Sequence, residues 1–111
     1  MIEETIREYL SGALDVPVWM EVPRQPPDRF VVAEKTGSSR ENHINQAMIA
    51  LQSYGETLHA AAVLNEQVKA AMDRAEVLES VCKVQLNGDY NFTDTSTGRY
   101  RYQAIYDIAH Y

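Results

Sequence analysis

Three histidines and one cysteine are the residues of this 111-residue chain best suited to metal binding or acid–base chemistry. His43, His59 and His110 stand far apart, and neither they nor Cys82 form the HExxH or CxxC spacings that hold zinc. The sequence therefore predicts no metal site. Cys82 lies in an apolar, strand-like run, which predicts a buried and unreactive thiol.

Glu56 and His59 lie one helical turn apart, at a spacing that would let the two side chains share a proton. We interpret them instead as a solvated surface contact, worth on the order of 0.3 kcal/mol. The chain has no GxSxG motif, no phosphate-binding loop and no dinucleotide fingerprint, and no serine stands in a nucleophile context. We therefore expect no catalytic residues, no cofactor and no enzymatic activity.

Seven tyrosines are the most unusual feature of the composition. Tyr100, Tyr102 and Tyr106 would lie on one face of the last predicted strand, where aromatic rings can stack on nucleic-acid bases. Tyrosines are also common on sheet faces and in protein interfaces. Ten Lys and Arg against sixteen Asp and Glu give a net charge of −6, which disfavours binding to phosphate backbones. A core or interface role is the favoured interpretation.

Length and composition are those of one globular domain, residues 1–111, with 45% hydrophobic and 23% charged residues. No apolar run approaches the roughly 20 residues that span a bilayer. The first residues lack the charged and apolar regions of a secretory signal. We expect a cytoplasmic protein without membrane contact.

Hydrophobic periodicity predicts two amphipathic helices. The first covers Ile2–Leu14. The second follows Gly55, with Glu56 and Thr57 in its first turn. Its predicted buried stripe consists of Ala61, Leu64, Val68, Ala71, Met72 and Ala75.

Alternating apolar residues predict five strands. They are Val16–Val22, Phe30–Thr36, the stretch from Asn42 to Tyr54, Glu79–Leu86, and a last strand from about Arg99 to Ala109. The third is apolar on both faces, as in a central strand covered on both sides. The proline-rich VPRQPPD is interpreted as a connector rather than a polyproline ligand. The order α-β-β-β-α-β-β predicts an α+β fold, a mainly antiparallel sheet packed by two helices.

Two polar segments between strands are predicted loops. Gly37–Asn42 is typical of a hairpin tip longer than two residues. Asn87–Gly98 is predicted to be a long exposed loop or the tip of an extended hairpin; a tight turn at Asn87–Gly88, pairing 81–86 with 89–94, is the alternative. We hypothesise that both loops contact neighbouring molecules. The proposed contact residues are Ser38, Ser39, Arg40, Glu41, Asn42, Thr93, Asp94, Thr95, Ser96 and Thr97.

The amino-acid sequence resembles a family of small tail proteins of phages and prophages of Gram-positive bacteria. These are the tail-terminator (tail-completion, tail-to-head joining) proteins of long, non-contractile-tailed phages. The resemblance runs from Val16 to Tyr111. It is carried by the segments VPVWMEVP, RFVVAEKTG, NHINQAMIALQSYG, LNEQVKAAM and DYNFTDTSTGRYRYQAIYDIAHY.

This resemblance implies a non-enzymatic α+β subunit that forms a homo-hexameric ring at the head-proximal end of the tail tube. The ring would end tube polymerisation and dock to the head connector. The implied partners are further copies of the chain, the tail-tube protein and the head connector protein. The implied locations are the host cytoplasm during assembly and then the virion tail.

The negative charge suggests that DNA would pass through such a ring without specific binding, because like charges repel. Two other functions remain open from the sequence. One is a head–tail connector component. The other is a non-viral binding module that uses the tyrosine-rich last strand.

Overall fold

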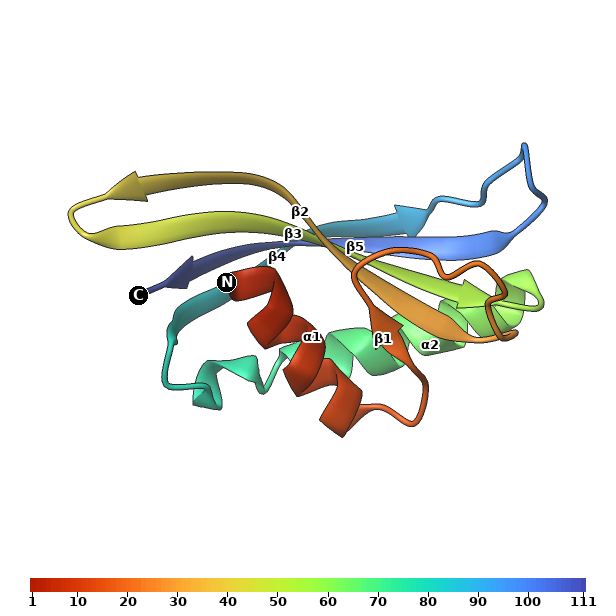
Figure 1. Cartoon of the computed structure of the whole chain (residues 1–111), viewed down its shortest axis with the longest axis horizontal. Coiled ribbons are helices and arrows are strands. Elements are labelled where there is room, and N and C mark those ends of the chain that lie inside the picture. Colours follow the sequence, from red (N-terminus) through yellow and green to blue (C-terminus); the bar gives the residue numbers. More distant parts are fainter.

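The computed structural model describes all 111 residues, Met1 to Tyr111, and shows a sheet with both α-helices packed on one face (Figure 1). The predicted α+β class and the order α-β-β-β-α-β-β are confirmed, and a short 3-10 helix, η1, is added after the second helix. The elements are α1 (Ile2–Ala13), β1 (Val18–Trp19), β2 (Phe30–Glu41), β3 (Ile44–Gly55), α2 (Leu58–Met72), η1 (Ala75–Val77), β4 (Val81–Asn91) and β5 (Tyr100–His110).

The sheet has the order β1-β2-β3-β5-β4, so β3 lies at its centre and β4 forms one edge. Every pairing is antiparallel except that of β1 with β2. The predicted strand Val16–Val22 is wrong in length, because β1 contains only Val18 and Trp19. A parallel pair requires the chain to cross back between its strands, and residues 20–29, with their three prolines, make that crossing without regular structure.

The main core lies between the helices and the covered face of the sheet. The helix α1 contributes Ile2, Ile6 and Leu10, which are spaced four residues apart and so lie on one face of the helix. All six residues of the predicted stripe of the second helix are buried, but Ala75 lies in η1 because α2 ends at Met72. The sheet contributes the buried side chains Val31, Ala33, Ala47, Ile49, Leu51, Ala104, Tyr106 and Ile108.

A smaller cluster lies on the opposite face, at the end of β3 near Gly55. Phe30 and Tyr54 stack with ring centroids 4.3 Å apart, and Trp19 packs on Phe30 at 5.7 Å. Farther along the same face, Met48 is 38% exposed. The expectation that the central strand is covered on both faces is therefore correct at one end only.

The connection between β2 and β3 is a two-residue turn, so the predicted longer tip Gly37–Asn42 is wrong. Only Asn42 and His43 lie outside the strands, with φ angles of 52° and 66°. Two positive φ values are the mark of a type I′ turn, whose twist matches that of the strands. The predicted loop residues Ser38, Ser39, Arg40 and Glu41 are strand residues and pair with Ala47, Gln46, Asn45 and Ile44.

His43→Gly is expected to stabilise the protein by about 1 kcal/mol, because glycine has no Cβ atom, whereas L-residues other than Asn and Asp are strained at positive φ. Urea unfolding followed by circular dichroism would measure the change. Arg40→Gly, three positions earlier in the regular strand, is the control and should destabilise instead. A stability loss in His43→Gly would contradict the turn geometry.

The β4–β5 hairpin differs from prediction in two places. β4 continues to Asn91, so the alternative tight turn at Asn87–Gly88 is wrong; a bulge in the pairing lies there instead, between Leu86 and Gly88. Cys82 is exposed rather than buried. It falls within a second bulge, between Val81 and Lys83, on a strand that has no neighbour on its outer side.

Candidate assembly surfaces

The outer half of the β2–β3 hairpin, residues 37–48, forms an arm that extends beyond α1 at one end of the molecule (Figure 1). β1 pairs only with Val31 and Val32, so no strand lies on the outer side of β2 along the arm. Ser38, Ser39, Arg40, Glu41 and Asn42 are all exposed on it. The arm thus presents an unpaired strand edge and polar side chains, which suit contact with another chain.

A surface hollow lies where the arm meets α1. Its volume is about 430 Å³, and Lys35, Arg40 and His110 are among the residues that line it. Lys35 also faces Glu3 of α1, with Nζ 3.7 Å from a carboxylate oxygen. The base of the arm is therefore polar, and charged side chains gather around it.

The tip of the β4–β5 hairpin, residues 92–99, holds its own shape through short side-chain hydrogen bonds. The Asp94 carboxylate accepts from the Ser96 backbone N–H at 3.0 Å, from the Ser96 hydroxyl at 2.6 Å and from the Thr97 N–H at 3.4 Å. These bonds lower the pKa of Asp94 to about 2. Just before it, Asn91 Oδ1 accepts from the N–H and the hydroxyl of Thr93. The tip is thus a pre-formed surface with Thr95, Ser96 and Thr97 exposed.

The structure separates the two groups of contact residues that the sequence singled out. The arm and the tip lie at opposite ends of a molecule that measures 43 × 25 × 24 Å (Figure 1). They therefore form two distinct surfaces, each able to meet a different neighbour.

Arg101 anchors the base of the tip and was not among the sequence-predicted residues. Its Nε donates to the Phe92 carbonyl at 2.6 Å and its Nη1 donates to the Tyr54 hydroxyl at 2.9 Å. Its guanidinium also lies 4.4 Å from the centre of the Phe92 ring. The only feature of the sequence that could have indicated a role for Arg101 is its position between Tyr100 and Tyr102 in the last strand.

The three tyrosines of β5 do not form one exposed platform. Tyr106 is 2% exposed and lies in the main core, and burial raises the pKa of its hydroxyl to about 12. Tyr102 is half-buried and Tyr100 is exposed. No ligand can stack on Tyr106 while the helices cover that face.

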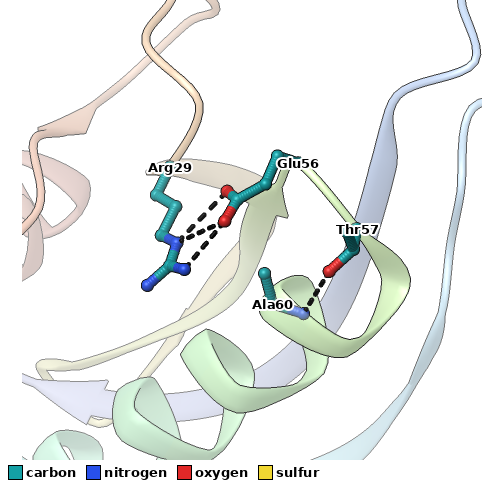
Figure 2. A network of polar contacts seen from close by, with 4 residues as sticks. All are labelled: Arg29, Glu56, Thr57 and Ala60. Carbon is teal, nitrogen blue, oxygen red and sulfur yellow. Dashed lines mark hydrogen bonds and ion pairs between the residues drawn. The ribbon is translucent and has the colours of Figure 1, made fainter.

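Glu56 binds Arg29 rather than His59. The Arg29 Nη2 donates to Glu56 Oε1 at 2.7 Å, and its Nε lies 3.1 and 3.2 Å from the two carboxylate oxygens (Figure 2). This hydrogen bonding lowers the pKa of Glu56. Beside it, the Thr57 hydroxyl accepts from the Ala60 N–H at 3.0 Å and caps α2 (Figure 2). The pair therefore ties the end of the β1–β2 crossing to the start of α2.

A second polar cluster joins α2 to β4. Asp89 Oδ2 accepts from Asn65 Nδ2 at 2.8 Å and from Lys69 Nζ at 2.9 Å, and Lys69 Nζ also lies 3.0 Å from Glu66. Hydrogen bonding to Lys69 lowers the pKa of Asp89, and hydrogen bonding to Asp89 raises the pKa of Lys69. None of the surface hollows includes these side chains. The arrangement therefore ties α2 to the edge strand β4.

Lys69→Met is expected to destabilise the protein by about 1–2 kcal/mol at pH 7, because Asp89 loses its cation at a partly buried position. The depressed pKa of Asp89 stabilises the fold above the ordinary aspartate pKa and ceases to do so as pH falls through the folded-state pKa. The difference between wild type and variant should therefore shrink below about pH 4. Urea unfolding at pH 7 and pH 3 measures both values, and an unchanged difference would contradict this role.

The structure contains no group of three or more His, Cys, Asp or Glu side chains that could hold a metal ion. None of the helices has the length and apolar character needed to cross a membrane. No protein-family model matches the sequence, and no curated protein matches it either.

Proposed function

We propose that this chain is a virion structural subunit that forms a ring on the head-proximal end of a phage tail tube, ends tube polymerisation and docks to the head connector. The observation that carries this proposal is the position of the two contact surfaces at opposite ends of the long axis. A ring between tube and connector needs a different surface toward each, and the arm and the tip supply two.

The construction of these surfaces supports the same role. The tip is held by hydrogen bonds within its own backbone and side chains, so its contacts lose little conformational freedom on binding. The arm ends in a tight turn and carries an unpaired strand edge. Both features favour docking between proteins over binding of a small molecule in a cavity.

The partners under this proposal are further copies of the chain, expected as a homo-hexamer, together with the tail-tube protein and the head connector protein. DNA would pass through the ring without sequence-specific contact, consistent with the net charge of −6. The protein would work in the host cytoplasm during assembly and then in the virion tail.

The test is to polymerise the tail-tube protein with and without this chain and to measure tube lengths by negative-stain electron microscopy. Capped tubes should stop growing and should show a ring of extra density at one end. Light scattering on the same samples gives the native mass of any ring. Unrestricted tube growth at saturating concentrations of the chain would overturn the proposal.

A further inference from the structure

The largest of the five surface hollows, about 680 Å³, lies at the β1 edge of the sheet. Trp19, Met20 and Val22 line it with apolar surface, and the side chains of Met20 and Val22 are 38% and 39% exposed. The charged residues around it are Arg7, Arg24 and Glu21, which leave one net positive charge (two minus one) on a chain of net charge −6. Arg24 forms no ion pair with the rest of the chain.

The helix η1 presents an apolar residue in a negatively charged setting. Val77 is 77% exposed, more than any other large apolar residue. Glu76 and Glu79 flank it, both exposed and without an ion pair, and with Arg74, the exposed residue just before η1, they leave one net negative charge. Ala75 is buried in the core on the inner side of this turn, and Glu76 Oε1 accepts from the Val84 N–H at 3.3 Å. The turn is therefore held in place with its apolar residue directed outward.

These two features cannot meet within one molecule. The hollow lies beside β1 and η1 packs beside β4, the two opposite edges of the order β1-β2-β3-β5-β4. A second copy of the chain can bring them together, because its η1 can reach the hollow of the first. Contacts between two different surfaces of identical subunits repeat head to tail and close into a ring when the rotation allows.

We propose that η1 of one copy docks in the hollow of the next copy. Val77 packs against Trp19, Met20 and Val22, and the carboxylates of Glu76 and Glu79 lie near the guanidinium groups of Arg7 and Arg24. The inference rests on the proposed ring and names its lateral interface. It leaves the arm and the tip free for the neighbours above and below the ring.

Charge reversal on each side tests the pairing. Arg24→Glu and Glu79→Arg should each weaken self-association by about tenfold or more, because like charges then meet across the interface. The double variant Arg24→Glu/Glu79→Arg restores opposite charges in every copy and should recover most of the association. Glu34→Arg, an exposed carboxylate on β2 without an ion pair, is the matched control and should associate like wild type. Sedimentation velocity over a range of concentrations measures all four variants.

Disulfide cross-linking tests the same contact, and it also works if the ring assembles only in the presence of the tail tube. Chains carrying Cys82→Ser with Val77→Cys are mixed with chains carrying Cys82→Ser with Val22→Cys, with and without tubes. A disulfide between the two chains is expected on mild oxidation, and Glu34→Cys in place of Val22→Cys should give none. The absence of the Val77–Val22 cross-link, with or without tubes, would overturn this interface.

The two proposals fail separately. If the chain caps tubes but charge reversal has no effect and the cross-link does not form, the interface is wrong and the proposed function stands. If the cross-link and the double variant behave as expected but tubes grow without limit, the interface stands and the proposed function is wrong.

Discussion

Gly55→Ala is expected to destabilise the protein by about 3 kcal/mol, which is the upper end of the usual cost of overpacking. A Cβ atom at this position would lie 2.5 Å from the Ala61 nitrogen and 2.9 Å from the Ala60 carbonyl carbon. Both are backbone atoms in the first turns of α2, so no side chain can rotate away. The helix would have to move off the sheet, and its buried stripe would lose contacts with β3 and β5.

Urea unfolding monitored by circular dichroism measures this loss. Gly12→Ala is the matched control, because it is the same substitution at an exposed helical position with no atom within 4 Å of the added Cβ. It should be neutral or stabilising by about 0.5–1 kcal/mol. Equal stabilities of Gly55→Ala and wild type would mean that α2 does not approach β3 this closely.

Shortening the arm is expected to reduce tube capping to background while the fold survives. The change replaces Arg40–Asn45 with Asn-Gly, so that Ser39 and Gln46, two pairs before Glu41 and Ile44 and in phase with them, become the last pair before a new type I′ turn. None of the six removed residues is buried, so the free energy of unfolding should stay within about 1 kcal/mol of wild type. The loss of capping follows because Arg40, Glu41 and Asn42, three of the five proposed contact residues of the arm, are gone.

Deleting only Ser38 to Glu41 would be a poorer experiment. These residues pair with β3, and their removal alone would leave one side of the hairpin without partners. His43→Gly is the control for the shortened arm, since it changes the turn and keeps every arm contact residue; it should cap tubes normally. Normal capping by the shortened arm would show that the arm makes no essential contact, and tube lengths in negative-stain images decide between the outcomes.

Two differences between the sequence-based predictions and the structure occur where strand pairing sets the local structure. The sequence places Asn42 in a longer tip and His43 in the next strand, because the pair lacks the glycine that marks most two-residue turns. The pairing of Glu41 with Ile44 is what makes these two residues the turn. The apolar neighbours of Cys82 predict a buried thiol. Its strand lies at the edge of the sheet, and the alternation of residues 81–86 does not distinguish an edge strand from an interior one.

The sequence by itself determined the α+β class, the order of the helices and strands, the buried stripe of α2 and the central position of β3. These follow from periodicity, because a helix or strand must bury the face on which its apolar residues recur. Tertiary structure alone decided the short β1, the Arg29–Glu56 and Lys69–Asp89 pairs, the close approach at Gly55, and the opposite positions of arm and tip. Each depends on which segments become neighbours in space, and side-chain spacing along the chain carries no record of that choice.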